Sequence, residues 1–76
     1  MSLEIIRLNP DAKKIAKSIY ENNEDLMTAL PKHCILNGKP IPQLMLIVIE
    51  EHAKLNPDTP LDQIETNKQK VIELYF

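Results

Sequence analysis

Four polar side chains near the middle of the chain are of the types that perform acid–base chemistry or bind metals. They are Glu50, Glu51, His52 and Lys54. Adjacent glutamates on a helix point about 100° apart, so Glu50 and Glu51 do not face one site. Two histidines of a helical metal site are spaced four residues apart, and His52 has no such partner. We interpret this group as the solvated end of a helix.

Cys34 and the neighbouring His33 are the second candidate pair. No motif of a nucleophilic cysteine and its base surrounds them, and a single cysteine can form neither an internal disulfide nor a CxxC zinc-ligand pair. A lone cysteine is usually a small buried thiol, and it favours a reducing, cytoplasmic setting. We therefore expect no enzyme, no metal and no other cofactor.

Size and composition limit the function further. The chain has 76 residues, one glycine, no tryptophan and 4% aromatic residues, which indicates one domain with few rigid anchors for a deep pocket. Nine basic and eleven acidic side chains give a net charge of -2, which argues against avid nucleic-acid binding by charge alone. We expect a soluble monomer without a signal peptide or membrane span.

One helix organises the elements that would position any site. Pro42 and Pro57 bracket the only unbroken apolar run, Leu44 to Ile49. Proline is accepted in a first helical turn and disfavours helix at the residue before it, so we predict a helix of about four turns between the two. Because the run is apolar on all sides, we place this helix at the centre of a bundle.

The N-terminal part predicts an arm and an amphipathic helix. We expect residues 1–8 to form a partly ordered arm over the core, since the segment is too short and mixed to assign by periodicity. Asn9 would cap a helix that begins at Pro10 and ends near Glu21. Its apolar stripe consists of Ala12, Ile15, Ala16, Ile19 and Tyr20.

The middle of the chain predicts a short helix and a turn. Asn23 would cap the helix, and Pro31 would end it. The Asn37-Gly38 pair is typical of a tight turn, and we expect Cys34 to Leu36 before it to be an extended or single-turn segment tucked inward. No segment shows the pattern of a strand.

Two further short helices are expected after Pro57. Thr59 and Pro60 would start the first, and Thr66 with Gln69 fits the capping box of the second. Their apolar sides consist of Leu61, Ile64, Val71, Ile72 and Tyr75. The fold class that follows is a single all-α domain over residues 1–76, a small four- to five-helix bundle.

Six basic or titratable side chains are the candidates for contact with nucleic acid. They are Lys32, His33 and Lys39 around the turn, and Lys13, Lys14 and Lys17 on the outer face of the first helix. A basic loop beside a helix end can contact a phosphate backbone, although a charged outer face is also what any soluble amphipathic helix shows. Lysines 54, 68 and 70 are weaker candidates, because each has an acid within about one helical turn.

From residue 31 onward, short elements follow one another in a defined order: a proline, an apolar segment, a polar turn, a leucine-bearing helix, a second proline with a threonine, and a basic final helix. The positions are Pro31, His33, Ile35-Leu36, Asn37-Gly38, Leu44, Pro57, Thr59, Leu61, Ile64, Lys68 and Tyr75. This order resembles the HRDC module of RecQ-type helicases and ribonuclease D. The chain departs from it in having His33 at the family's aromatic position and Glu65-Thr66 in place of a glycine.

The resemblance implies an HRDC-like helical bundle that binds single-stranded or branched DNA weakly and has no chemistry of its own. Its setting would be phage or bacterial DNA replication, recombination and repair, in the host cytoplasm if a phage encodes it. The alternative is a protein-interaction module that docks on a helicase or another replication protein. The sequence leaves both open.

Overall fold

The computed structural model of the protein describes residues 3–76, and their side chains from residue 11 onward. The elements are α1 (Leu3–Glu21), α2 (Leu26–His33), β1 (Ile35–Leu36), β2 (Lys39–Pro40), α3 (Pro42–Leu55) and α4 (Leu61–Tyr75). The prediction of a small, mostly helical domain is confirmed. The two short strands, which pair as an antiparallel hairpin, show that the prediction of no strand was wrong.

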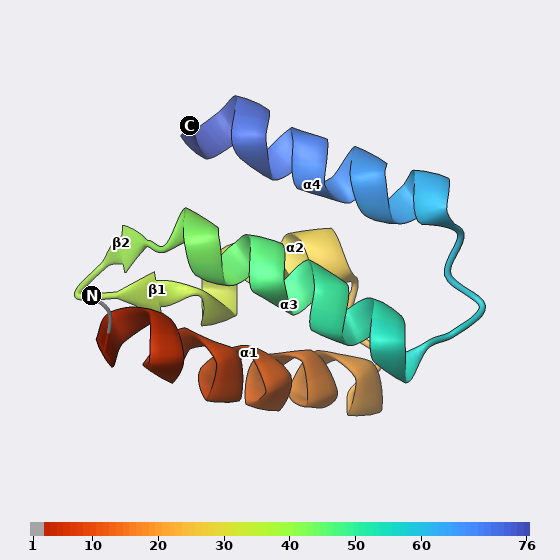
Figure 1. Cartoon of the computed structure of the whole chain (residues 1–76), viewed down its shortest axis with the longest axis horizontal. Coiled ribbons are helices and arrows are strands. Elements are labelled where there is room, and N and C mark those ends of the chain that lie inside the picture. The colour runs from red at the N-terminus through yellow and green to blue at the C-terminus, as the bar shows by residue number, and fades with distance from the viewer. Residues whose placement is uncertain (1–2) are drawn as a thin grey trace.

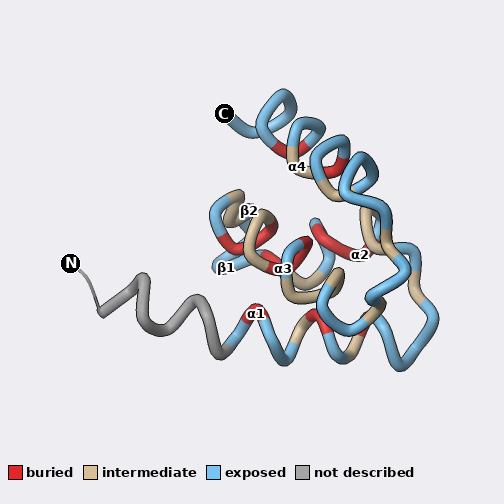
Figure 2. Tube along the Cα trace, turned by 45° about the vertical axis from the view of Figure 1, so that its right-hand side comes forward, coloured by how far each residue is buried: buried red, intermediate tan, exposed pale blue. Residues whose placement is uncertain are grey.

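Helix α3 lies at the centre of the molecule. In Figure 1, α1 and α4 lie along opposite sides of α3, and α2 lies behind it. Figure 2 shows buried positions on all four helices. The core consists of Ala12, Ala16, Ile19, Ala29, Leu30, Cys34, Leu44, Met45, Val48, Ile49 and Val71. Among the described side chains, α4 supplies a single buried apolar residue, so it is the helix with the smallest share of the core.

The predicted central helix is confirmed from its first proline to the residue before Asn56. Pro42 occupies the first turn, and the backbone N–H of Asn56 donates to the carbonyl of His52 at 3.1 Å where the helix ends. The apolar run is buried on one side only: Leu46 and Ile47 are partly exposed because no helix covers the opposite side of α3 along its whole length.

Helix α1 begins at Leu3, so the predicted start at Pro10 after an arm is wrong for residues 3–8. Met1 and Ser2, the remainder of the predicted arm, lie outside the described residues. A proline inside a helix removes one backbone donor and restricts the preceding turn, but it does not oblige the helix to start there.

Asn23 ends α1 instead of capping α2. Its φ of 54° is left-handed, and the backbone N–H groups of Asn23 and Glu24 donate to the carbonyls of Tyr20 and Ile19 at 3.2 and 3.0 Å. This is the Schellman pattern, in which asparagine replaces the usual glycine. The helix that follows is capped by Asp25.

Helix α2 continues through Pro31 to His33, two residues beyond the predicted end. The carboxylate of Asp25 accepts hydrogen bonds from the Thr28 hydroxyl at 2.7 Å and from the Thr28 backbone N–H at 3.0 Å. These bonds lower the pKa of Asp25, and the nearby charge of Lys70 acts in the same direction.

Helix α4 is continuous, so the predicted break before Thr66 is wrong. Between Leu61 and Tyr75 there is neither glycine nor proline to interrupt it, and capping residues are tolerated inside a helix when their side chains face solvent, as Thr66 does. Asn67 is buried instead, and its side-chain oxygen accepts a hydrogen bond from Gln63 Nε2 at 3.0 Å.

Candidate nucleic-acid interface

The three lysines of α1 lie on its outer surface. Lys13, Lys14 and Lys17 are exposed, on the side away from the buried Ala12, Ala16 and Ile19. Within residues 11–76, no acidic side chain forms an ion pair with any of the three. They therefore present positive charge to solvent, as predicted from the helical spacing.

Lys32 and His33 form the last turn of α2. Lys32 is exposed, whereas His33 is about one-third exposed and its Nε2 lies 3.4 Å from Oε2 of Glu24. A carboxylate thus faces the imidazole at the position where the HRDC resemblance places an aromatic residue near DNA. His33 is the candidate whose surroundings are least favourable to a phosphate.

Lys39 lies in the hairpin that follows α2. Asn37 and Gly38 form its turn with φ values of 54° and 78°, the left-handed pair of a type I′ turn, so the predicted tight turn is confirmed. The N–H of Ile41 donates to the carbonyl of Cys34 at 2.9 Å and closes the hairpin at its base. Lys39 is therefore exposed on a short but hydrogen-bonded element.

Cys34 anchors this hairpin in the core. It is fully buried, and desolvation raises the pKa of its thiol to about 12, so the thiolate is not formed at neutral pH. The prediction that Ile35 and Leu36 also tuck inward is wrong, because they are 46% and 64% exposed. Because each strand has only two residues, the hairpin enters the core only at its base, where Cys34 lies.

Two of the three lysines ranked lower from sequence, Lys54 and Lys68, are engaged by acids, whereas Lys70 is exposed and has no ion-pair partner within residues 11–76. Lys54 Nζ lies 3.1 Å from Oε2 of Glu51, and Lys68 of α4 pairs with Glu50 of α3. The Lys68–Glu50 pair joins two helices, so it cannot be predicted from the spacing of residues along one helix. Both lysines are less available to a ligand than those of α1.

The six predicted residues therefore form two groups. One is on α1, and the other extends from the end of α2 to β2. No hydrogen bond or ion pair recorded for residues 11–76 links the two groups. We call them the α1 lysine face (Lys13, Lys14, Lys17) and the hairpin group (Lys32, His33, Lys39).

Sequence reasoning missed the exposure of both tyrosines. Tyr20 and Tyr75 were predicted to be core residues, but they are 45% and 37% exposed. Tyr20 packs edge-on against His52, with ring centroids 6.0 Å apart and an interplanar angle of 75°. Tyr75 belongs to a group of exposed apolar side chains at the end of α4. We call this group the α4 apolar end; it consists of Ile72, Leu74, Tyr75 and Phe76.

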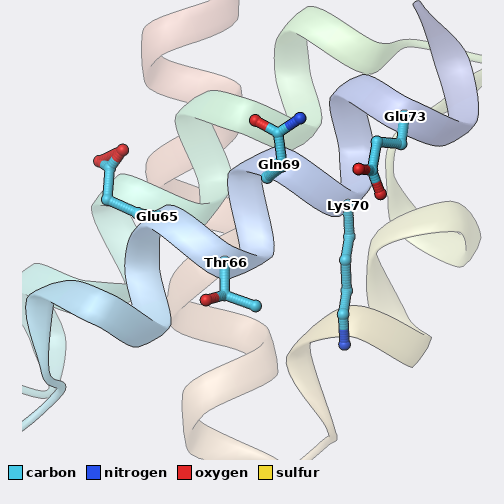
Figure 3. Close-up of a pocket in the computed structure, with 5 residues that line it drawn as sticks. All are labelled: Glu65, Thr66, Gln69, Lys70 and Glu73. Carbon is cyan, nitrogen blue, oxygen red and sulfur yellow. The ribbon is translucent and has the colours of Figure 1, made fainter.

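The hollow in the surface of α4 does not resemble an active site. Its lining residues, shown in Figure 3, are Glu65, Thr66, Gln69, Lys70 and Glu73. All five are exposed and come from one face of one helix, and Lys70 extends away from Glu73. A ligand there would remain open to water.

Comparisons of the chain with protein family models, curated proteins and solved structures find no match. Among the described residues, no cluster of three or more histidine, cysteine, aspartate or glutamate side chains is arranged to hold a metal ion. The described helices also include none that is long and apolar enough to cross a bilayer.

Proposed function

We propose that the protein is an auxiliary, non-catalytic module that binds single-stranded or branched DNA in phage or bacterial replication, recombination and repair. The observation that carries the proposal is the separation of its lysines. Those of the α1 lysine face and the hairpin group point to solvent without an ion-pair partner within residues 11–76, while Lys54 and Lys68 are held by acids. Lys70 also has no ion-pair partner there, but it lies on one face of α4 with Glu65 and Glu73. The HRDC resemblance of the segment from Pro31 onward supports the same function.

The distribution of acids along the chain strengthens this separation. From Leu26 to Ile49 there are two lysines and no aspartate or glutamate, whereas from Glu50 to Phe76 there are six acids and three lysines. The hairpin group thus lies in a locally positive segment of a chain whose net charge is -2. A few phosphate contacts are possible there, and binding should be weak and fall steeply with salt.

The test is a chemical-shift titration of ¹⁵N-labelled protein with single-stranded, duplex and forked DNA at low salt. We expect the largest shifts at Lys32, Lys39 and the α1 lysine face. Shifts confined to α4, or the absence of shifts with every DNA, would overturn the proposal.

A second function, docking on a helicase or another replication protein, is favoured by the α4 apolar end. Leu74 and Phe76 are 73% and 67% exposed, and several large apolar side chains exposed at one end of a helix can form a protein-interaction surface. Gel filtration with a purified recombination helicase would test it. Co-elution that is lost on changing Leu74 and Phe76 to serine, with DNA binding unchanged, would favour docking over DNA binding as the principal function.

A further inference from the structure

Tyr20 is held at the surface where α1 and α3 end side by side. The two helices run in the same direction and finish at the same end of the molecule (Figure 1). The ring of Tyr20 packs against the ring of His52, with 6.0 Å between centroids and 75° between planes. Since 45% of the residue remains exposed, part of Tyr20 is open to a ligand from solvent.

Two lysines of α1 lie on the same stripe as this ring. Lys13, Lys17 and Tyr20 are spaced i, i+4 and i+7, the interval that aligns side chains along one side of a helix. The rise of about 1.5 Å per residue puts Lys17 roughly 4.5 Å, and Lys13 roughly 10 Å, from Tyr20 along the helix axis. All three residues are exposed.

We propose that Tyr20 stacks against an unpaired base of single-stranded DNA, while Lys17 and Lys13 contact the phosphates of adjacent nucleotides. This inference rests on the proposed DNA-binding function and narrows it to unpaired strands. An aromatic face beside a line of cations is how proteins bind single strands without reading sequence, because every base has a face that can stack. Bases inside a duplex are already stacked and do not offer one.

The charges around Tyr20 are compatible with this use. Glu51 lies one residue from His52, but its carboxylate is engaged by Lys54 at 3.1 Å. Glu21 follows Tyr20 directly and therefore points about 100° away from it around the helix. Glu21 also lies four residues from Lys17, but the two side chains form no ion pair. Burial lowers the pKa of His52, so the ring that supports Tyr20 is neutral at pH 7.

The experiment compares a thymidine oligonucleotide, an abasic oligomer of equal length and a duplex by fluorescence anisotropy at low salt. We expect the native protein to bind the thymidine strand most tightly. Tyr20→Leu keeps an apolar side chain but removes the ring, and it should weaken thymidine binding about 5-fold or more, the low end of base–aromatic stacking. Binding to the abasic oligomer should not change.

Two variants act as controls. Tyr20→Phe keeps the aromatic face and should bind as the native protein does. Tyr75→Leu removes a ring of similar exposure on α4, far from the α1 lysine face in sequence, and should also have no effect. Circular dichroism establishes that each variant is folded.

Three results would overturn the inference. Equal binding of thymidine and abasic strands by the native protein, or full binding by folded Tyr20→Leu, removes the stacking role while leaving DNA binding intact. The absence of binding to all three DNAs removes the proposed function together with the stacking role.

Discussion

The imidazole of His52 is partly buried between α1 and α3, against the ring of Tyr20. Burial lowers the pKa of this group below its ordinary value of 6.5, because desolvation disfavours the charged form. Below pH 6.5 the unfolded chain therefore takes up the proton more readily than the folded chain. Stability should be complete above pH 6.5 and decrease as the pH falls from there toward the lower, folded pKa.

This expectation is tested by melting curves between pH 7.5 and 5.5, a range above the ordinary pKa values of the carboxylates. We expect the melting temperature to fall with pH in the native protein and to fall less in His52→Gln. A fall of equal size in His52→Gln would contradict the assignment.

The exposure of individual side chains is the property of the site that the sequence predicts least well. Tyr20 continues the apolar stripe that includes Ile19, yet Ile19 is fully buried whereas 45% of Tyr20 is exposed. Likewise, the partner of Lys68 is Glu50 on another helix. Both facts depend on how the helices pack against one another, which local periodicity does not contain.

Among the elements, the hairpin is the one whose geometry most directly positions a predicted site residue. Gly38 has a φ of +78°, and an added Cβ would meet no atom within 4 Å. Gly38→Ala would therefore be strained by the left-handed backbone and not by a clash, at a cost of about 1 kcal/mol. Lys39 would lose its fixed position next to the turn.

Urea unfolding measures the change in the stability of Gly38→Ala, and the DNA titration measures the effect of this change on the contact made by Lys39. Asn37→Gly is the matched control, since Asn37 has a φ of 54° and glycine accepts that conformation readily. We expect Gly38→Ala to be less stable and Asn37→Gly to be unchanged to within a few tenths of a kcal/mol. Equal stability of the two variants would show that the turn is not restrained as described.

The bounds of α3 and the hairpin turn were predictable, whereas the start of α1 expected at Pro10, the end of α2 expected at Pro31 and the break expected before Thr66 were not. The bounds of α3 and the turn at Gly38 follow from backbone restrictions that hold in any fold. The capping pattern at Thr66 and the proline at 10 are compatible with both a helix start and a helix interior.

At the scale of the whole molecule, stability depends on the buried side of α3. Ile49 is 1% exposed, whereas Ile47 is only partly buried. Ile49→Ala should cost about 2–5 kcal/mol, enough to unfold much of a marginally stable domain, and Ile47→Ala should cost less. Thermal melting followed by circular dichroism compares the two, and an order reversed from this would mean that α3 is rotated relative to the structure.

Charge is likewise arranged over the whole molecule: the lysines of the α1 lysine face and the hairpin group have no ion-pair partner within residues 11–76, whereas Lys54 of α3 and Lys68 of α4 are paired with acids. If Lys32 and Lys39 each neutralise a phosphate of a single strand, changing both to glutamine should lower the slope of log affinity against log salt by about 1.4, or 0.7 per contact. Binding to all sequences should weaken alike, because phosphate contacts carry no sequence information.

Lys68→Gln is the matched control: it removes one positive charge from the surface, but that charge is already held by Glu50. The loss of a pair between side chains that are 25% and 54% exposed should cost less than about 1 kcal/mol of stability. If net charge alone governed binding, each charge removed would lower the slope by the same amount, so a reduction for Lys68→Gln half that of the double variant would show that the hairpin group has no special part in binding.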